Sequence, residues 1–219
     1  MSTEVIEKVE VKKDNEALFS KKRKSLVSNP MDSDNPITIQ VLGICSALAV
    51  TIALEGTLIM AFAVMFVIVM ANVVISTLRN TIPNRIRIIV QLVVVATLVA
   101  TVDQVLRAVA YEQSKALSVF VGLIITNCIV MGRLEAFALG NKPWDSMLDG
   151  FGNAIGYGWI IIAIAFVREL FGAGKLLGFQ VLSKDWYVAN GFFATPAAAC
   201  IILGLIIWVL RARSGYVED

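Results

Sequence analysis

The sequence contains no histidine, and this absence excludes several kinds of site. Haem ligation by histidine, zinc sites built on imidazole and imidazole acid–base catalysis all need that side chain. A metal in this protein must therefore be bound by cysteine, methionine, carboxylate or backbone groups. Net charge is also small: 19 basic and 17 acidic residues nearly cancel, so the charge balance indicates no nucleic-acid partner.

Cysteine is scarce as well. The three cysteines, Cys45, Cys128 and Cys200, all lie in apolar stretches. Secreted disulfide frameworks have an even number of cysteines at regular spacings, so these residues do not indicate such a framework.

Hydrophobic residues are abundant: they make up 58% of the 219 residues, and the mean hydropathy is +0.77. Soluble domains contain about 45–50% apolar residues, so the excess predicts an all-α integral membrane protein surrounded by lipid. Six stretches approach the roughly 20 residues that a helix needs to cross the hydrocarbon core. They are Ile37–Leu54, Thr57–Leu78, Ile86–Leu106, Leu117–Leu139, Gly152–Phe171 and Ala189–Leu210.

We expect residues 1–36 to form a charged cytoplasmic tail and residues 37–219 to form one six-helix membrane domain. The tail is too polar for a signal peptide, whose apolar core lies near the start. Lys and Arg are more numerous on the side of the tail, and this bias places both termini in the cytoplasm.

The six spans divide into two halves of three, about 37–106 and 117–210. An odd number of spans per half means that the second half inserts upside down, as in the inverted repeats of transporters. Cys45 and Cys128 each lie in the first span of a half. Because such first helices are often broken near the midplane, we expect both to be broken or half-length, with the two thiols at a similar depth.

The two thiols allow two interpretations. Buried membrane cysteines most often act as small hydrophobic residues. Alternatively they bind iron, but two thiols cannot complete a Cys₄ site, so a second chain would have to supply the other pair. Cys200 has no counterpart in the other half, and we expect it to serve packing only.

Polar residues surround the second cysteine, in the segment ITNCIVMGRLEAF. A charge at the bilayer centre costs about 2.5–3.5 kcal/mol, so Arg133 and Glu135 need partners or a polar cavity. They are two residues apart and cannot pair in a regular helix. Either the helix breaks here, or each has a partner elsewhere, or the span ends near Gly132 and both lie at the interface.

Acidic residues near the ends of spans could line a cation path. Glu55 and Asp103 are candidates together with Glu135, although a solvated carboxylate at the interface is the simpler interpretation of the first two. The segment LDGFGNAIGYG lacks the spacing and the preceding strand of a nucleotide-binding loop. Its Gly152 and Gly156 form a small-residue face, which predicts helix packing.

Two stretches carry a resemblance to a known family. NPITIQVLGICSALAVT, and TNCIVMGRLEAFALGN with the following LDGFGNAIGYG, resemble the signature stretches of the D subunits of Na⁺-translocating NADH:quinone oxidoreductases. The wider family includes the homologous E subunits and the membrane subunits of Rnf complexes. The resemblance extends from Asn35 to Leu210, and GICSALAVT is more similar to the D type than to the Rnf type.

This resemblance implies a translocase subunit of the bacterial inner membrane, with no complete active site of its own. It implies pairing with the homologous six-helix E subunit and a 2Fe–2S cluster held by two cysteines of each subunit, here Cys45 and Cys128. Asn127 and Arg133 would supply donors near the cluster, and Gly132 would permit close approach of the partner. Electrons from NADH would cross the bilayer between flavin-bearing subunits towards ubiquinone, coupled to Na⁺ export.

Two alternatives stay open. An Rnf-type subunit would have the same architecture and iron centre but would couple ferredoxin to NAD. A secondary transporter could use the same inverted repeat without a redox centre, its broken helices binding a small solute or ion.

Overall fold

The computed structural model describes residues 26–28, 30, 35–83, 85–109, 122–176, 179–180 and 191–214. Most of the predicted tail, and residues 117–121 of the predicted fourth span, lie outside these ranges. The elements are α3 (Ile44–Val50), α4 (Leu54–Leu78), α5 (Arg87–Val109), α7 (Cys128–Arg133), the π-helix η2 (Leu134–Ala138), α8 (Pro143–Ala173), β1 (Lys175–Leu176), β2 (Phe179–Gln180), the 3₁₀-helix η3 (Gly191–Ala194) and α9 (Pro196–Ser214). The described part is therefore almost entirely helical, as predicted.

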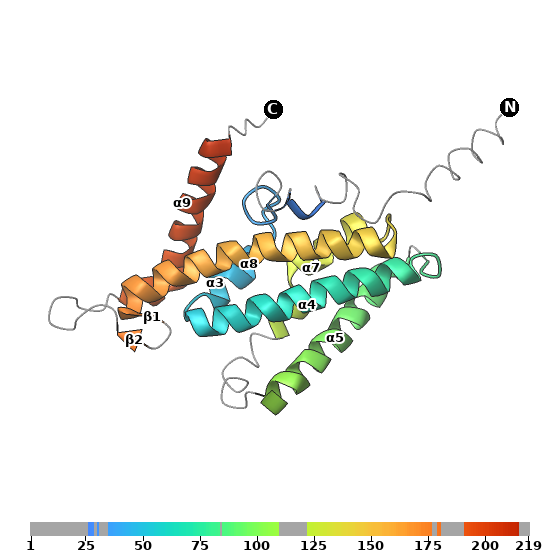
Figure 1. The fold of residues 1–219 in the computed structure, drawn as a ribbon, viewed down its shortest axis with the longest axis horizontal. Helices are drawn as coiled ribbons and strands as arrows, with labels where there is room; N and C mark the ends of the chain where they lie inside the picture. Colours follow the sequence, from blue (N-terminus) through green and yellow to red (C-terminus); the bar gives the residue numbers. More distant parts are fainter. Residues whose placement is uncertain are drawn as a thin grey trace.

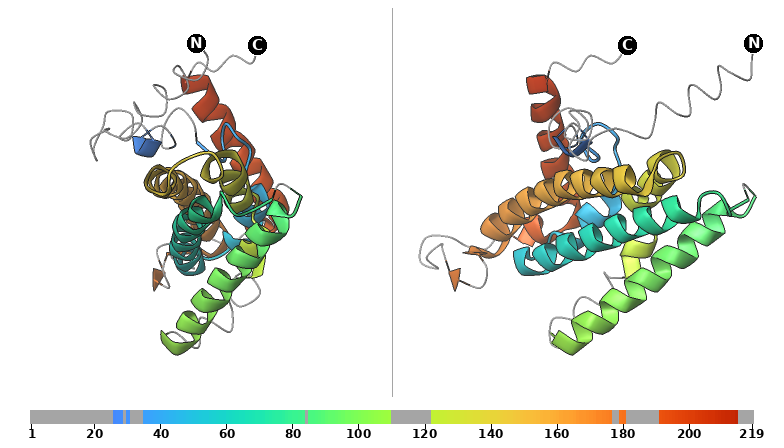
Figure 2. Two further views of the ribbon diagram at one scale, coloured as in Figure 1. Left: turned by 90° about the vertical axis from the view of Figure 1, so that its right-hand side faces the viewer. Right: turned by 45° about the vertical axis from the view of Figure 1, so that its right-hand side comes forward.

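Helices α4 and α8 lie side by side and form the centre of the molecule (Figure 1). They are antiparallel: Asn72, near the end of α4, contacts Ser146 near the start of α8, and Leu54, at the start of α4, contacts Glu169 near the end of α8. Helix α5 returns from the end of α4 and diverges from it, and α9 leaves the far end of α8 at a steep angle (Figures 1 and 2).

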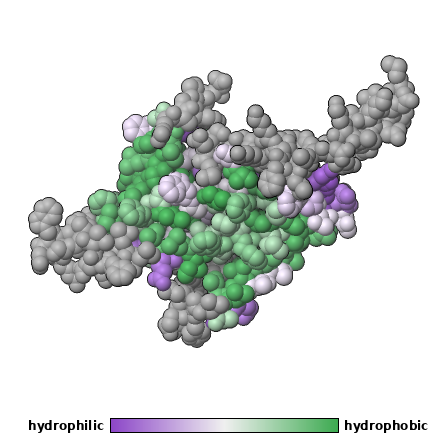
Figure 3. Space-filling view, viewed as in Figure 1, coloured by the Kyte–Doolittle hydropathy of each residue, from purple (hydrophilic) through white to green (hydrophobic). Residues whose placement is uncertain are grey.

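Three helices of the described residues are long and apolar enough to cross a membrane: Leu54–Leu78, Arg87–Ala108 and Pro143–Ala173. They correspond to the second, third and fifth predicted spans, and a shorter apolar helix, Pro196–Ala212, falls in the sixth. Figure 3 shows apolar residues over most of the coloured surface on one face, as expected for a surface that contacts lipid or other membrane helices. The arrangement of six spans as an inverted repeat stays a prediction.

The first span of each half is short. Helix α3 has seven residues and follows Gly43, whose φ of 84° lies in the left-handed region. Helix α7 has six residues, follows the N-cap Asn127 and continues into the five-residue π-helix. The predicted spans Ile37–Leu54 and Leu117–Leu139 are thus interrupted where the structure describes them, as expected.

Helix α8 differs from its prediction at its start. It begins with Pro143 in the first turn and has 31 residues, whereas the predicted span begins at Gly152. The early turns contain Trp144, Asp145, Ser146 and Asp149, so hydropathy detects only the part of the helix that is apolar enough to cross the membrane. Proline is favoured at the first position of a helix because its missing N–H would be unpaired there.

Gly152 and Gly156, two of the five glycines of α8, lie at close backbone contacts, in keeping with the packing role predicted for them. A Cβ atom at Gly152 would lie 2.7 Å from the carbonyl oxygen of Leu26, and one at Gly156 would overlap the carbonyl of Pro30. Both positions therefore let the segment before the first span approach the α8 backbone.

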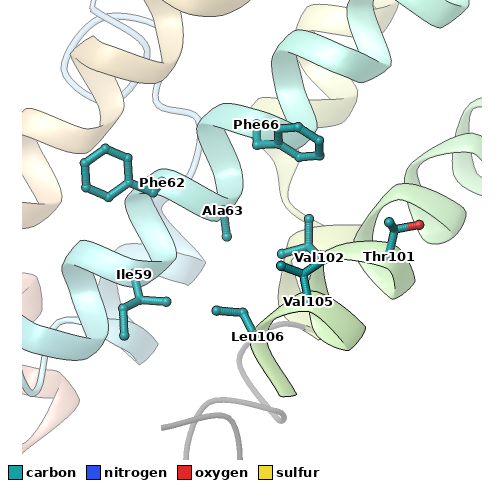
Figure 4. A pocket seen from close by; sticks show the side chains of 8 residues that line it. All are labelled: Ile59, Phe62, Ala63, Phe66, Thr101, Val102, Val105 and Leu106. Carbon is teal, nitrogen blue, oxygen red and sulfur yellow. The ribbon is translucent and has the colours of Figure 1, made fainter. Parts of the chain in front are cut away.

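An apolar groove of about 520 Å³ lies between the diverging helices α4 and α5 (Figure 4). It is lined by Ile59, Phe62, Ala63, Phe66, Thr101, Val102, Val105 and Leu106. The hydroxyl of Thr101 donates to the carbonyl of Thr97, 2.9 Å away, so this polar group is already satisfied within α5.

Candidate functional site

The two cysteines of the half-helices come together in the fold. Cys45 lies in the first turn of α3 and Cys128 is the first residue of α7. Their thiols are close enough to interact with each other, and both are free rather than joined in a disulfide. Cys45 is exposed and Cys128 is half-buried. A pair of adjacent thiols, one of them open to the surface, is thus formed by segments far apart in the sequence.

Gly43 determines the local geometry of this pair. Its backbone N–H donates to the sulfur of Cys128 over 2.8 Å, a contact that joins the start of α3 to the start of α7. A Cβ atom at this position would lie 2.8 Å from the ring of Tyr157. Because the φ of Gly43 is also positive, only glycine fits here without strain.

A buried polar network connects α3, α7 and α8 beside the thiols. The Asn127 side chain accepts from the N–H of Ile129 and donates to the hydroxyl of Ser46 over 3.2 Å. The same Ser46 hydroxyl lies 2.7 Å from the hydroxyl of Tyr157 and donates to the carbonyl of Gly43 over 2.9 Å. Asn127, Ser46 and Tyr157 are each at most 2% exposed. The network therefore holds both cysteine-bearing helices in a fixed relation to α8.

Sequence reasoning finds Asn127 but not Ser46 or Tyr157 as members of this site. In the sequence, Ser46 is only a small neighbour of Cys45. The available signal for Tyr157 is its hydroxyl within the GNAIGYG segment of an apolar helix, since buried tyrosine hydroxyls usually find a partner.

The donor set fits half of an iron–sulfur centre. Thiolates are the ligands of such clusters, and a backbone N–H directed at a ligand sulfur stabilises its negative charge. Among the described residues there is no group of three or more His, Cys, Asp or Glu that could hold a metal ion. A complete set of four sulfurs would therefore require a second chain at the exposed side of Cys45.

The chain's relatives were identified by comparison with known proteins. Residues 23–207 match the family model described as "Rnf-Nqr subunit, membrane protein". The chain belongs to the Rnf-Nqr family of membrane proteins. It is 55% identical over 196 residues to the D subunit of the Na⁺-translocating NADH-quinone reductase of Pasteurella multocida (strain Pm70), covering 88% of this chain and 94% of that protein. The D subunits of Yersinia pestis (strain Pestoides F) and Yersinia pseudotuberculosis (serotype O:1b, strain IP 31758) give the same identity and coverage.

In this Rnf-Nqr chain, Arg133 binds a carboxylate of α8. Its Nε donates to Asp149 over 3.0 Å, its Nη2 also contacts that carboxylate, and its Nη1 donates to Gln40 over 3.4 Å. Asp149 is 2% exposed and also accepts from Asn153. These bonds are directed towards α8 and Gln40, so a role of Arg133 as a donor to a cluster stays a prediction.

Glu135 has a different partner. It pairs with Arg87 at the start of α5 and accepts from Gln91 over 3.1 Å. Arg133 and Glu135 therefore have separate partners, which is one of the alternatives expected from the sequence. A π-helix also begins between them, at Leu134. Residues two apart point to different sides of a helix, so these two charges face different elements.

The three acids proposed for a cation path do not share one site. Glu135 contacts the start of α5, whereas Asp103 pairs with Arg107 near its end, over 2.8 Å. Along a helix with a rise of 1.5 Å per residue, Arg87 and Asp103 are roughly 24 Å apart. Glu55 is exposed in the first turn of α4. A path using all three would have to extend across much of the membrane.

Two other predicted residues lie in unexpected surroundings. A Cβ atom at Gly132 would lie 3.0 Å from the side chain of Leu42, so the close approach at this glycine is to the same chain. A contact of Gly132 with a partner stays a prediction. Cys200 is exposed on α9, so the packing role expected of it is not in the core of this chain.

Proposed function

We propose that this chain is a membrane subunit of a Na⁺-translocating NADH:quinone oxidoreductase, of the D type, in which Cys45 and Cys128 hold half of a shared iron–sulfur centre. The observation that carries the proposal is the pair of adjacent free thiols at the starts of α3 and α7, with Cys45 exposed. The identity of 55% to D subunits over 88% of the chain supports the assignment to this complex.

Each residue of the site has a defined task in this proposal. Cys45 and Cys128 would bind the iron of a 2Fe–2S cluster whose other ligands come from the homologous E subunit. The Gly43 N–H donates to the Cys128 sulfur, and Ser46 and Asn127 hold the two half-helices at a fixed separation. When bound, such a cluster supplies one-electron transfer at a depth that flavin-bearing subunits on either side of the membrane can reach.

The proposal also covers Na⁺ export and the orientation of the chain in the membrane. The coupling cation would pass along carboxylates of the membrane subunits, for which Glu55, Asp103 and Glu135 are the candidates of this chain. We infer that both termini face the cytoplasm of a bacterial inner membrane, because Lys and Arg gather on that side of the sequence.

The test is iron analysis of the whole complex. The chain is co-purified with its partners, and iron per complex and the EPR spectrum of the reduced sample are measured for the wild type, Cys45→Ser and Cys128→Ser. Cys200→Ser is the matched control, because it removes an exposed thiol elsewhere in the same chain. We expect each of the first two substitutions to abolish one iron signal with assembly intact, and the control to retain it.

An unchanged iron content and spectrum in Cys45→Ser and Cys128→Ser would return both cysteines to packing and favour a transporter without a redox centre. The family model covers Rnf as well as Nqr subunits. The electron donor accepted by the purified complex separates these two: NADH supports the Nqr type, and ferredoxin supports the Rnf type.

A further inference from the structure

Arg168, near the end of α8, is a fully buried cation that the proposed function does not use. It is 2% exposed. All the acceptors that the structure gives its guanidinium are neutral oxygens from two parts of the chain. They are the carbonyl of Leu48 and the hydroxyl of Thr51 on one side, and the carbonyls of Phe193, Ala194 and Thr195 on the other.

The first group of acceptors lies at the end of the half-helix α3. The last carbonyls of a helix have no partner within it, and in a membrane each unpaired polar group is costly. Here the Ala47 carbonyl accepts from Thr51 over 2.6 Å, and the Val50 carbonyl accepts from Thr57 over 3.2 Å. The Leu48 carbonyl accepts from Arg168 over 3.3 Å. A helix that ends inside the protein is thereby satisfied by side chains, including one from α8.

The second group lies where η3 leads into α9. Nε of Arg168 donates to the Phe193 carbonyl over 3.0 Å, and Nη2 donates to the Ala194 carbonyl over 3.0 Å. Because the guanidinium is planar and carries five donors in a fixed arrangement, one side chain joins both segments in one geometry. The neighbouring Glu169 accepts from the N–H of Leu54, so α8 also holds the start of α4.

We propose that Arg168 is a positioning residue that fixes the far end of α3 against the start of α9 and thereby sets the separation of the Cys45 and Cys128 thiols. Helix α3 is a rigid unit of seven residues with two attachments. Its start is held by Gly43 and Ser46. Its end is held by Arg168 and by the hydroxyl of Thr57. Releasing the end lets the helix tilt about its start, which displaces Cys45 relative to Cys128. The importance of this separation for electron transfer depends on the function proposed above, but the separation itself does not.

The separation can be measured by cross-linking. The whole complex, carrying Cys200→Ser in this chain, is treated with a chelator under reducing conditions to remove iron and then oxidised mildly with diamide. The Cys45–Cys128 disulfide is quantified by mass spectrometry of the linked peptides, and iron content and the EPR line shape are recorded before chelation. Disulfides form only between cysteines whose Cα atoms lie within about 7 Å, so the yield is sensitive to small displacements.

We expect Arg168→Gln to lower the disulfide yield by about threefold or more, because the Cβ atoms no longer meet the narrow geometry of the bond. Arg168→Lys should give an intermediate yield, since an ammonium is a point donor that cannot bridge both groups of acceptors. Arg85→Gln is the charge-matched control, because Arg85 is exposed beside the α4–α5 turn. The disulfide yield of this variant should equal that of the wild type. In the iron-loaded complex, Arg168→Gln should also change the EPR line shape.

A wild-type yield and line shape in an assembled Arg168→Gln complex would overturn the proposal. If Arg168→Gln prevents assembly, Thr51→Val replaces it, because it removes the 2.7 Å acceptor of Nη1 and leaves the cation in place. A lowered yield in Thr51→Val then supports the proposal, and a wild-type yield overturns it. If the purified wild-type complex contains no iron and Arg168→Gln still lowers the disulfide yield, the iron centre is refuted and this inference stands.

Discussion

Gly43 has the strictest requirement of any single residue at the site. A left-handed conformation costs a residue with a Cβ atom about 1–2 kcal/mol, and the added atom would also approach the Tyr157 ring to 2.8 Å. We expect Gly43→Ala to lower the thermal unfolding midpoint of the purified protein and its yield in membranes. Gly191→Ala is the control, because a Cβ atom there meets nothing within 4 Å. Equal stability of the two variants would show that the start of α3 can adjust.

The Ser46 hydroxyl should matter more than that of Tyr157, because it is shared by more partners. Tyr157→Phe removes one hydroxyl and leaves Ser46 bonded to Gly43 and Asn127, so we expect a loss of about 0.5–1.5 kcal/mol. Ser46→Ala leaves the Asn127 amide and the Tyr157 hydroxyl buried without this partner, which costs about 1–3 kcal/mol. Unfolding of the two variants in the same detergent tests the order, and a reversed order would contradict the network.

At this scale the sequence predicts the residues that act locally and misses those that act through the fold. Cys45, Cys128 and Asn127 can be named as candidates because their neighbours in the chain single them out. Tyr157 joins the site from α8, 111 residues from Ser46, and nothing in the local pattern indicates that contact. The carboxylate partner of Arg133 is missed for the same reason, since Asp149 lies on another helix.

The ion pair of Arg133 and Asp149 joins α7 to α8, and its two side chains are 14% and 3% exposed. Removing one partner of a buried pair leaves an uncompensated charge and costs about 3–5 kcal/mol. We therefore expect Arg133→Gln to be strongly destabilising, and the double variant Arg133→Gln/Asp149→Asn to recover much of the loss. Thermal unfolding of the four proteins of this double-mutant cycle gives the coupling energy.

The pair of Asp103 and Arg107 provides the comparison for that cycle. It lies within α5, and the Arg107 side chain is 54% exposed. Exposed pairs of this spacing contribute about 0.3–0.5 kcal/mol, so Arg107→Gln should change the unfolding midpoint little. If Arg133→Gln were no worse than Arg107→Gln, the buried pair would have no structural importance.

Hydropathy predicts the helices in proportion to how apolar they are. It locates α4, α5 and the apolar part of α8, because a continuous run of apolar residues is itself the signal. It cannot locate the start of α8 at Pro143, since the first turns are polar. The short helices α3 and α7 are expected from the repeat argument, but their ends depend on the glycine at 43 and the cap at 127.

For the whole molecule, the packing of α4 on α8 determines which loops share a side of the membrane. The hydroxyl of Ser76, near the end of α4, donates to the carbonyl of Asn141, just before α8. The α4–α5 turn and the start of α8 therefore lie at one end of the molecule, and Leu54 lies with Glu169 at the other (Figure 1). The structure thus shows which loops lie on the same side of the membrane, whereas the prediction of which end faces the cytoplasm comes from the sequence alone.

Basic residues predict which end that is. Arg79, Arg85, Arg87 and Lys142 all lie at or beside the α4–α5 turn and the start of α8. Loops rich in Lys and Arg stay on the cytoplasmic side during insertion, so this end should be cytoplasmic.

Cysteines introduced at the exposed positions Thr81 and Gly140 should then react with a membrane-impermeant maleimide only from the cytoplasmic face. A cysteine at the exposed Gly191 should react only from the opposite face. The labelling is measured in intact cells and in inverted vesicles, with the parent protein carrying Cys200→Ser as the background. Reaction of positions 81 and 140 from opposite faces would contradict the antiparallel packing of α4 and α8. Reaction of both from the outside would keep that packing and reverse the predicted orientation.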